Sequence, residues 1–443
     1  MVAAVRLVDA ELQPGGPDSR AVRQKPRVVI VGAGFAGIAA ARALRHADAD
    51  VLLIDRRNHH IFQPLLYQVA TAVLSSAEIA APIRQLEASQ ENVSVVMAEV
   101  TAIDVAGHSV DARLNESSVR KIAFDFLVVA TGMRTSYFGH DEFARYASGL
   151  KNLSDAETIR AKILRAFEVA ATTNDEKERA RQMTFVLVGA GPTGVELAAS
   201  LAHMVNVTLR RNFHRIDPSK SEIILLDAGD RVLPTFAETL ARKATARLAR
   251  LGVKVMTGTK VDAVDEFGVI AGGTRIPSAT VLWTAGVAAS PLPKLLGGKT
   301  DRAGRAVVDR FLRIADDPSV FVIGDAASVQ QDERPVPGVA QAAIQEGHYV
   351  GQLIADKLQG QDAETPFHYV DKGSMAVVGK NYAVLERGSL RTSGLLTWLA
   401  WAFVHILSLP QIQNRLRVQS QWLWSYFTGQ RSSRLIPERS DLS

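Results

Sequence analysis

The stretch that most constrains the fold of this chain is a strand–turn–helix–strand pattern over residues 28–55. Four apolar, mainly β-branched residues, typical of a buried parallel strand, lead directly into the spacing Gly-x-Gly-x-x-Gly at Gly32, Gly34 and Gly37. The first glycine permits a tight turn, the second lets a pyrophosphate approach the backbone, and the third lets the next helix pack closely on its strand. A second strand, Val51–Ile54, ends at Asp55, whose carboxylate can accept hydrogen bonds from both hydroxyls of a ribose. This order of elements predicts a Rossmann-type dinucleotide site.

The same pattern returns later in the chain. A strand over Thr184–Val188 leads into a second set of glycines at the same spacing, Gly189, Gly191 and Gly194, and a helix follows. Its partner strand, Ile223–Leu226, ends at Asp227, which is far from the glycines because residues 205–220 are inserted. Two such fingerprints predict two bound dinucleotides, or one dinucleotide and a second site of similar shape.

Other predicted strands end in small or acidic residues, at the edge where open α/β sheets bind ligands. Phe126–Val129 is followed by Thr131 and Gly132, and a similar Thr-Ala-Gly ending at 284–286 follows a strand beginning at Val281. The strand 320–323 delivers Gly324 and Asp325. A helix then begins near Ala340, and it places Gln341 and Gln345 on one face because they are four residues apart.

Composition narrows the class of protein. A chain of 443 residues is long enough for two or three domains, and its net charge of +5 is too small to indicate a nucleic-acid partner. Cysteine is absent, which excludes disulfides, zinc–cysteine sites, iron–sulfur clusters and thiol redox centres, and no metal site is predicted. The first 23 residues lack the apolar core of a secretory signal and are predicted to form a disordered tail.

Two segments leave more than one interpretation open. Residues 56–70 mix polar and apolar side chains without a period, and Pro64 breaks any helix there. They form either a surface connection or a loop that covers a bound ring, with Gln63 and Gln68 as donors. The helical stretch Asp155–Ala171 contains Glu168, for which the residues alone favour a solvated position.

The C-terminal part combines apolar helices with one sign of charge. Leu395–Leu409 is apolar nearly all round and ends at Pro410, but as one helix it is shorter than the hydrocarbon core of a bilayer. A second helix follows, with Ile412, Leu416, Leu423 and Phe427 on one face and Asn414, Arg417 and Gln421 opposite. Trp422, Trp424 and Tyr426 are aromatic residues typical of a membrane interface. Six arginines and no acidic residue lie between Arg387 and Arg434. The pattern predicts a helix pair on an anionic lipid surface, with a dimer interface or packed core helices as the alternative.

These motifs together resemble those of flavoprotein reductases that bind two dinucleotides. Within that group, residues 60–70 (HIFQPLLYQVA) and 340–346 (AQAAIQE) resemble type II NADH:quinone oxidoreductases, the single-subunit, non-proton-pumping NADH dehydrogenases. The resemblance extends over about Arg27 to Ile436, and these two strings are much more specific than either glycine loop.

The resemblance implies an α/β fold with two Rossmann-like domains, arranged as in glutathione reductase, and a C-terminal amphipathic helical region that binds the membrane. It implies the segments 1–23 (tail), 24–150 and 289–370 (FAD domain), 151–288 (NADH domain) and 371–443 (membrane-associating region).

The resemblance also implies which residues bind the cofactors FAD and NADH. Those assigned to FAD are Gly32, Gly34, Phe35, Ala36, Gly37, Asp55, Arg56, Gln63, Val100, Thr131, Gly132, Gly324, Asp325 and Gln341. Those assigned to NADH are Gly189, Gly191, Pro192, Thr193, Gly194, Glu196, Asp227, Ala285 and Gly286. Asp227 repels a 2′-phosphate and thereby favours NADH over NADPH, although Arg231 lies close enough in sequence to soften that preference.

By the same resemblance, NADH reduces the flavin and a membrane quinone then takes two electrons and two protons. The catalytic residues implied are Glu168, Gln341 and Gln345, and those beside the quinone are Gln341, Gln345 and Lys380. The expected partners are the quinone, anionic phospholipid and a second copy of the chain. The expected location is the cytoplasmic face of the inner or plasma membrane, bound peripherally.

Three other functions compete with this one. Sulfide:quinone oxidoreductase chemistry needs cysteines to hold sulfur, and the chain has none. A ferredoxin- or rubredoxin-type NAD(P)H reductase would keep both Rossmann domains but needs no membrane-binding C-terminus. A non-enzymatic sensor would bind FAD and NADH as a conformational signal and would not turn over.

Overall fold

The computed structural model describes residues 25–116, 118–210, 212–315, 317–361 and 365–436. The predicted tail, residues 1–23, therefore lies outside the described residues. The chain forms two compact units. Unit 1 contains the residues up to His60, then Ala81–Arg134 and Val287–Lys372. Unit 2 contains Ile61–Ala80, Thr135–Gly286 and the chain from Gly373 onward.

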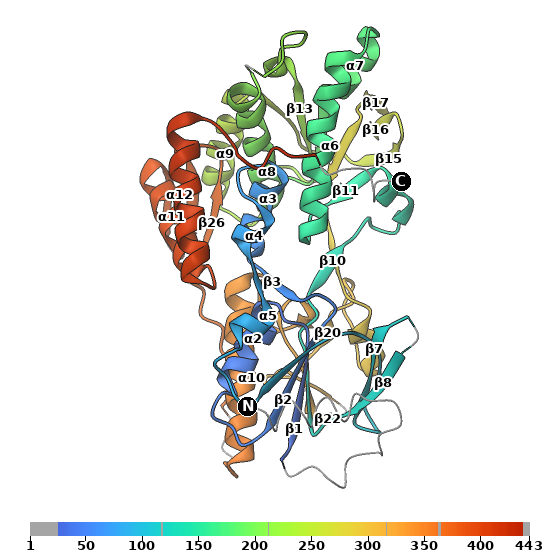
Figure 1. The fold of residues 1–443 in the computed structure, drawn as a ribbon, viewed down its shortest axis with the longest axis vertical. Helices are drawn as coiled ribbons and strands as arrows, with labels where there is room; N and C mark the ends of the chain where they lie inside the picture. The colour runs from blue at the N-terminus through green and yellow to red at the C-terminus, as the bar shows by residue number, and fades with distance from the viewer. Residues whose placement is uncertain (1–24, 117, 211, 316, 362–364, 437–443) are drawn as a thin grey trace. The chain divides into compact units, whose positions relative to one another are not determined.

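Unit 1 is built on a six-stranded sheet in the order β21-β22-β9-β1-β2-β5 (Figure 1). Strand β1 is buried along its whole length and pairs in parallel with β2 and β9, as expected for a sheet covered on both faces. The strands are β1 (Arg27–Val31), β2 (Asp50–Asp55), β5 (Val93–Met97), β9 (Phe126–Val129), β21 (Arg313–Ile314) and β22 (Asp317–Val322). A three-stranded sheet of β6 (Glu99–Asp104), β7 (Ser109–Asn115) and β8 (Ser118–Ala123) adds Val110, Ala112 and Ile122 to the same core.

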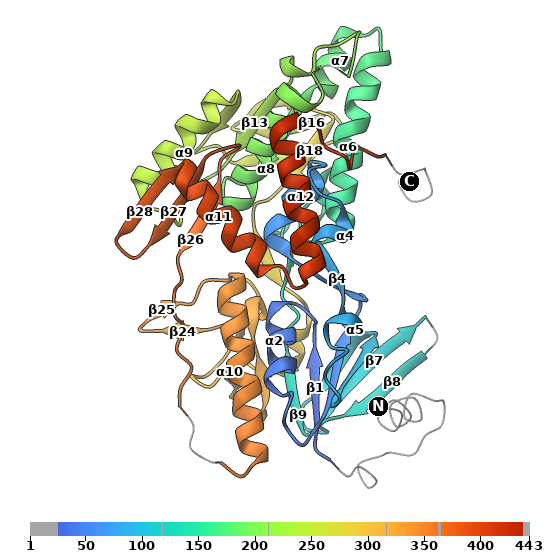
Figure 2. The ribbon, with the colours of Figure 1, turned by 60° about the vertical axis from the view of Figure 1, so that its left-hand side comes forward.

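Two helices of unit 1 pack against each other at unusually close range. These are α2 (Phe35–Ala43), which follows the first glycine loop, and α10 (Ala340–Leu358); Figure 2 shows them side by side. A Cβ atom on Gly347 would lie 2.1 Å from the carbonyl oxygen of Ala36, and one on Gly351 would lie 2.6 Å from that of Ala40. The glycines of α10 therefore let its backbone touch that of α2, which brings the beginnings of both helices to the same end of the sheet.

Unit 2 repeats the design with a five-stranded parallel sheet in the order β11-β18-β12-β13-β14. Its strands are β11 (Ala147–Gly149), β12 (Thr184–Val188), β13 (Glu222–Leu226), β14 (Val253–Met256) and β18 (Thr280–Trp283). The helices around it are α6 (Leu153–Thr172), α7 (Glu176–Gln182), α8 (Pro192–His203) and α9 (Glu238–Arg250). Helix α6 begins two residues before the predicted start because Asn152 caps it, accepting a hydrogen bond from the Asp155 backbone N–H at 2.9 Å.

The remaining elements are short. In the first third of the chain they are β3 (His59–Ile61), α3 (Leu66–Ala70), α4 (Ser76–Ile79), β4 (Ala80–Pro82), α5 (Ile83–Leu86) and β10 (Met133–Thr135). Those that follow are β15 (Val261–Asp265), β16 (Gly268–Ala271), β17 (Thr274–Pro277), β19 (Val287–Ala289), β20 (Ala306–Val307), β23 (Ala327–Ser328), β24 (Gln330–Gln331) and β25 (Arg334–Pro335).

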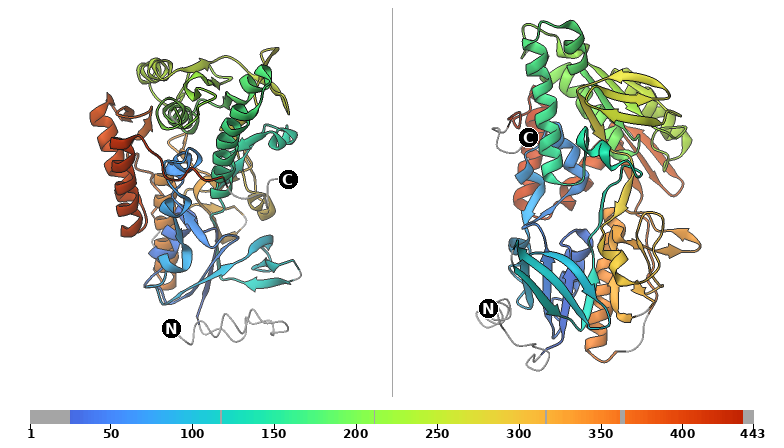
Figure 3. Two further views of the ribbon diagram at one scale, coloured as in Figure 1. Left: turned by 45° about the horizontal axis from the view of Figure 1, so that its top comes forward. Right: turned by 90° about the vertical axis from the view of Figure 1, so that its right-hand side faces the viewer.

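The C-terminal part of unit 2 carries a hairpin sheet and two helices. The sheet is formed by β26 (Ser374–Val377), β27 (Ala383–Arg387) and β28 (Leu390–Gly394), and the helices are α11 (Leu395–Ser408) and α12 (Ile412–Thr428). Figure 3 shows the two helices beside each other in further views. Within the described ranges, no helix combines the length and the apolar character that crossing a membrane requires.

The helices α11 and α12 expose most of their large apolar residues. Large apolar side chains more than one third exposed are Leu395, Leu396, Leu399, Phe403, Val404, Leu407, Ile412, Leu416, Leu423, Trp424 and Phe427. Asn414 is instead buried, and its amide donates to the carbonyls of Ala77, Glu78 and Ala80 at 2.9–3.2 Å. The alternative of packed core helices is therefore wrong, because most of the large apolar side chains of both helices are exposed rather than buried.

The architecture confirms the predicted α/β class with two Rossmann-like units and a C-terminal helical region. All strands predicted beside the two glycine loops are present within one residue of their predicted bounds. The sequence analysis assigns the segment Ile61–Ala80 to the FAD domain, whereas in the structure this segment is part of unit 2. Strand periodicity does not reveal this, because the segment is a loop with short helices.

The contact between α2 and α10 predicts the outcome of one substitution. We expect Gly347→Ala to lower the free energy of unfolding of unit 1 by about 1–3 kcal/mol, since the new methyl group meets backbone that cannot rotate away. Chemical denaturation followed by circular dichroism measures this. His348→Ala, at the exposed neighbouring position, is the control and should stay within about 0.5 kcal/mol of the parent chain. Equal stability of the two variants would contradict the close contact.

Candidate functional site

The first glycine loop has the geometry of a pyrophosphate cradle. Gly32 has φ +105°, and a Cβ there would lie 2.4 Å from the carbonyl oxygen of Ala130, so only glycine fits. A Cβ on Gly37 would lie 1.8 Å from the carbonyl oxygen of Gly32. A Cβ on Gly34, the N-cap of α2, would meet no atom within 4 Å. The open space therefore lies in front of the backbone N–H groups at the N-terminus of α2, where an anion is stabilised.

The acid at the end of β2 is tied to this loop. One carboxylate oxygen of Asp55 accepts the Ala33 backbone N–H at 2.8 Å, and the other accepts the Arg57 backbone N–H at 2.8 Å. Each oxygen has a second lone pair, so the carboxylate can still accept from ribose hydroxyls. The loop and the acid are thus positioned together.

The second loop repeats this geometry in unit 2. One oxygen of Asp227 accepts the Ala190 backbone N–H at 2.5 Å, and the other accepts the Gly229 backbone N–H at 2.7 Å. Gly191 caps α8 and faces open space, as Gly34 does in unit 1. Arg231, which could attract a 2′-phosphate, instead donates to the carbonyl of Pro234 at 3.3 Å. The charge beside this cradle is therefore that of Asp227.

Two further acidic groups of unit 1, one from the turn after β22 and one from α10, lie at Gly324. Asp325 follows Gly324, whose backbone N–H donates to the Glu346 carboxyl at 2.5 Å. Glu346 is 3% exposed; burial raises its pKa to about 8, the Gly324 N–H lowers it and Asp325 raises it. Glu346 is therefore mostly protonated at neutral pH and holds the turn that presents Asp325.

The structure places most residues assigned to FAD around the loop of unit 1. Phe35 and Ala36 open α2, Val100 is buried on β6, and Thr131 and Gly132 follow β9. Arg56 is exposed, and Gln63 lies in unit 2. The cradle, the ribose acid and the Gly-Asp turn fit a dinucleotide such as FAD.

The two glutamines of α10 are engaged in hydrogen bonds with the following chain. The Gln345 amide donates to the Val370 carbonyl at 3.0 Å and accepts the Val370 N–H at 2.9 Å. The Gln341 side-chain oxygen accepts the Lys372 N–H at 2.9 Å. Both residues lie on one face near the start of α10, as predicted, and here they fix the segment that leads out of unit 1.

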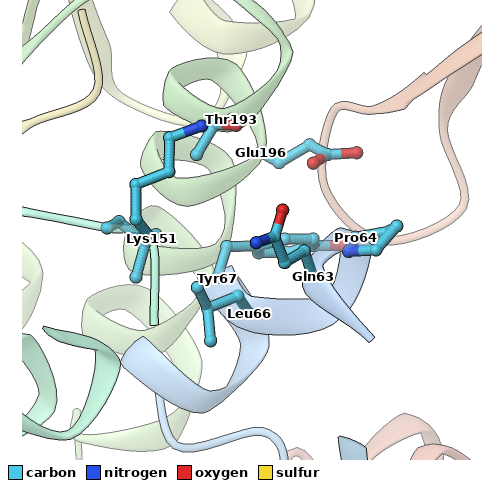
Figure 4. A pocket seen from close by; sticks show the side chains of 8 residues that line it. Gln63, Pro64, Leu66, Tyr67, Lys151, Thr193 and Glu196 are labelled. Atoms are coloured by element: carbon cyan, nitrogen blue, oxygen red, sulfur yellow. The ribbon is translucent and has the colours of Figure 1, made fainter. Parts of the chain in front are cut away.

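Unit 2 contains a pocket beside its glycine loop (Figure 4). Its walls come from residues of α3 and its preceding turn, the segment before α6, and the first turns of α8: Gln63, Pro64, Leu66, Tyr67, Leu150, Lys151, Thr193 and Glu196. Burial raises the pKa of Glu196 to about 8, although its carboxyl accepts the Val377 N–H at 3.1 Å, which opposes the shift. The pocket therefore has a mostly neutral carboxyl, a phenol, an aliphatic hydroxyl, an amide and one ammonium group as its polar lining.

Two other predicted residues have different surroundings. Glu168 is exposed on α6, in agreement with the solvated position favoured by the residues alone. The Lys380 ammonium donates to the Tyr426 carbonyl at 2.7 Å and lies 4.0 Å from the centre of the Tyr426 ring. Lys380 therefore neutralises the C-terminal end of the α12 dipole.

Several notable residues were missed by the sequence reasoning. Tyr67 and Lys151 line the pocket, and Arg431 is buried, donating to the carbonyls of Thr71 and Ser200 at 2.6 and 3.0 Å. Burial lowers the pKa of the Arg431 guanidinium to about 9. No local pattern marks Lys151 or Arg431, whereas Tyr67 lies inside the string over residues 60–70 that carried the resemblance.

Comparisons with known proteins agree with this geometry. The model of the pyridine nucleotide-disulphide oxidoreductase family matches residues 26–347, and that of the NDH2 C-terminal domain matches residues 372–431. The type II NADH:quinone oxidoreductase NdhA of Mycobacterium tuberculosis is 42% identical over 438 residues, which cover 96% of this chain and 92% of the relative. Ndh of the same organism is also 42% identical, over 96% of this chain and 93% of its own.

The fold has a counterpart among solved structures. The structure of NDH2 from Plasmodium falciparum in complex with NADH matches with a TM-score of 0.84 at 21% identity. The match covers 92% of this chain and 99% of that one.

The carboxylate at the end of β13 predicts the nucleotide preference. We expect Asp227→Asn to lower the ratio of kcat/KM for NADH over NADPH by about tenfold, because the amide keeps the acceptor for a backbone N–H but no longer repels a 2′-phosphate. Steady-state kinetics with both nucleotides measure the ratio. Glu222→Gln, exposed at the start of the same strand, is the control. An unchanged ratio in Asp227→Asn would refute this role.

Proposed function

The chain belongs to the type II NADH:quinone oxidoreductase family, and we propose that it oxidises NADH and reduces a membrane quinone by two electrons without pumping protons. The observation that carries the proposal is the pair of dinucleotide cradles, each tied to its own ribose acid, in a chain that also exposes an apolar helix pair. A soluble reductase needs the cradles but has no use for the exposed apolar face.

The residues of unit 1 would hold FAD. The N-terminus of α2 would bind its pyrophosphate, Asp55 its adenosine ribose, and Asp325 its ribityl chain. When bound, FAD supplies the two-electron chemistry that connects a nicotinamide to a quinone. The N-terminus of α10 would stabilise negative charge beside it, since the dipole of a 19-residue helix ends there.

The residues of unit 2 would hold NADH, with its pyrophosphate at the N-terminus of α8 and its adenosine ribose on Asp227. The predicted contacts of Glu196, Ala285 and Gly286 with NADH, and of Gln341, Gln345 and Lys380 with the quinone, are part of this proposal. Glu196, with a pKa of about 8, can hold or release a proton near neutral pH in the pocket that it lines. Glu168, exposed on its helix, would act only where a ligand approaches that surface.

The function is tested by turnover with different acceptors. We expect the FAD-loaded chain to reduce a short-chain quinone with NADH catalytically, since both cradles and the pocket serve one relay, and to reduce ferredoxin at least 100-fold more slowly, an order-of-magnitude expectation for an unmatched protein partner. Anaerobic steady-state kinetics with each acceptor measure both rates. Faster reduction of ferredoxin would favour the soluble reductase, and NADH oxidation that stops after one equivalent would favour the sensor.

We further propose that α11 and α12 bind an anionic phospholipid surface on the cytoplasmic face of the inner or plasma membrane. Leu396 and Phe427 are each 80% exposed, one on each helix, which in water is unfavourable for large apolar side chains. The arginines of this region and the absence of acidic residues between Arg387 and Arg434 suit an anionic surface. A second copy of the chain could cover the same face instead, and the experiment below separates the two.

The exposed face predicts the effect of charged substitutions. We expect the double variant Leu396→Glu and Phe427→Glu to lose at least tenfold in its affinity for vesicles containing anionic phospholipid. Two apolar side chains that would insert into the lipid are replaced by carboxylates, which the anionic surface repels. Cosedimentation with vesicles measures the affinity, and light scattering measures the oligomeric state. Phe267→Glu, which changes a 58% exposed side chain on a different hairpin of unit 2, is the control and should bind normally. Retention on vesicles together with dissociation of a dimer would assign the face to self-association.

A further inference from the structure

A chain of hydrogen bonds connects α12 to the pocket of unit 2. The indole N–H of Trp422 donates to the side-chain oxygen of Gln68 at 2.7 Å, and the Gln68 amide nitrogen donates to the Tyr67 hydroxyl at 3.1 Å. Gln68 and Tyr67 are both 5% exposed, and Tyr67 lines the pocket together with Glu196. The path therefore starts on the helix whose other face is exposed and apolar, and it ends at a phenol in the pocket wall.

The orientation of Gln68 is dictated by Trp422. An amide could in principle present either its oxygen or its nitrogen to Tyr67, but an indole N–H is only a donor. The Gln68 oxygen must therefore face Trp422, and its NH₂ group must face Tyr67. The phenol oxygen accepts this bond, so its own hydrogen is directed to another acceptor.

Trp422 is itself held in place by aromatic packing. Its ring stacks on Trp401 with centroids 5.2 Å apart and planes 25° apart, and Trp401 stacks on His405 at 4.4 Å. The His405 ring in turn contacts Phe62 edge-on at 6.1 Å. Rings from both C-terminal helices thus fix the indole N–H that orients Gln68.

The state of Tyr67 makes it suitable as a donor. Burial raises the pKa of its hydroxyl well above the usual range, and Glu196 adds to that shift. The hydroxyl therefore stays protonated at physiological pH and can donate to a carbonyl oxygen in the pocket. Figure 4 shows Tyr67, Gln63 and Glu196 around the same space. The phenol is therefore a donor of this pocket whose direction neighbouring side chains fix.

We propose that Gln68 and Trp422 are positioning residues that direct the Tyr67 hydroxyl to a carbonyl oxygen of the quinone in this pocket, where the quinone would follow NADH in turn beside Thr193 and Glu196. The proposal rests on the quinone reductase function proposed above. It assigns a role in substrate binding to two residues that do not line the pocket, one of them on the helix that carries the exposed apolar face. If either hydrogen bond is removed, the hydrogen of the Tyr67 hydroxyl can rotate away from the pocket. The hydrogen bond to the quinone is then formed for only part of the time.

The test uses the FAD-loaded full-length chain and a short-chain quinone, with binding measured by isothermal titration calorimetry. We expect Trp422→Phe, Gln68→Met and Tyr67→Phe each to raise the Kd for the quinone about five- to tenfold, the usual effect of one lost hydrogen bond. In the Tyr67→Phe background, Trp422→Phe should cause no further loss, because the group that it positions is gone. The KM for NADH with ferricyanide as acceptor should stay unchanged in Trp422→Phe and Gln68→Met, since neither residue lines the pocket.

Matched controls separate positioning from damage to the fold. Trp398→Phe removes an indole from α11, where Trp398 packs against Tyr426, and should leave quinone binding unchanged. If Trp422→Phe does not fold, as judged by its melting temperature, Gln68→Met alone decides the matter. Additive losses in the double variant, or an unchanged Kd in a folded Gln68→Met variant, would overturn the proposal. Failure of the parent chain to reduce quinone at all would instead overturn the proposed function.

Discussion

The hydrogen bond between a glycine loop and the acid that ends the next strand is the interaction on which the rest of this structure depends. In unit 1 it connects Ala33 with Asp55 at 2.8 Å, and in unit 2 it connects Ala190 with Asp227 at 2.5 Å. Each bond fixes a turn in which glycine is required, points a helix N-terminus at open space, and leaves the acid able to accept from a ribose. Two dinucleotides can be held in one chain because this arrangement is built twice.

The parts of the fold that the sequence predicts are those determined by local rules. Buried strands are recognised as short apolar runs. At Gly32 the turn has φ +105°, and a Cβ would lie 2.4 Å from a carbonyl oxygen, so only glycine fits there. The exposure of the apolar face of α12 also follows from its pattern, since the residues predicted on that face, such as Leu416 and Phe427, are the exposed ones. Periodicity determines which residues share a face, and composition indicates what that face meets.

The site was less predictable because its groups are brought together by long-range contacts. The pocket of unit 2 combines Tyr67, Lys151 and Glu196, which are separated by many residues in the sequence, and Gln68 meets Trp422 across 354 positions. Burial raises the pKa of Glu196 to about 8, and the neighbouring residues in the sequence do not indicate this shift. The glutamine string of α10 was recognised, but the bonds of Gln345 to Val370 depend on where a distant segment returns.

We propose above all that the two dinucleotide sites serve a single pathway, which carries two electrons from NADH through FAD to a quinone. Anaerobic rapid mixing tests it most directly, by following the visible absorption of the flavin in the FAD-loaded chain. The account predicts that NADH bleaches this absorption within the time of one turnover and that a quinone added in a second mixing step restores it equally fast. Bleaching by NADH without recovery on mixing with quinone, or a chain that takes up no flavin, would contradict it.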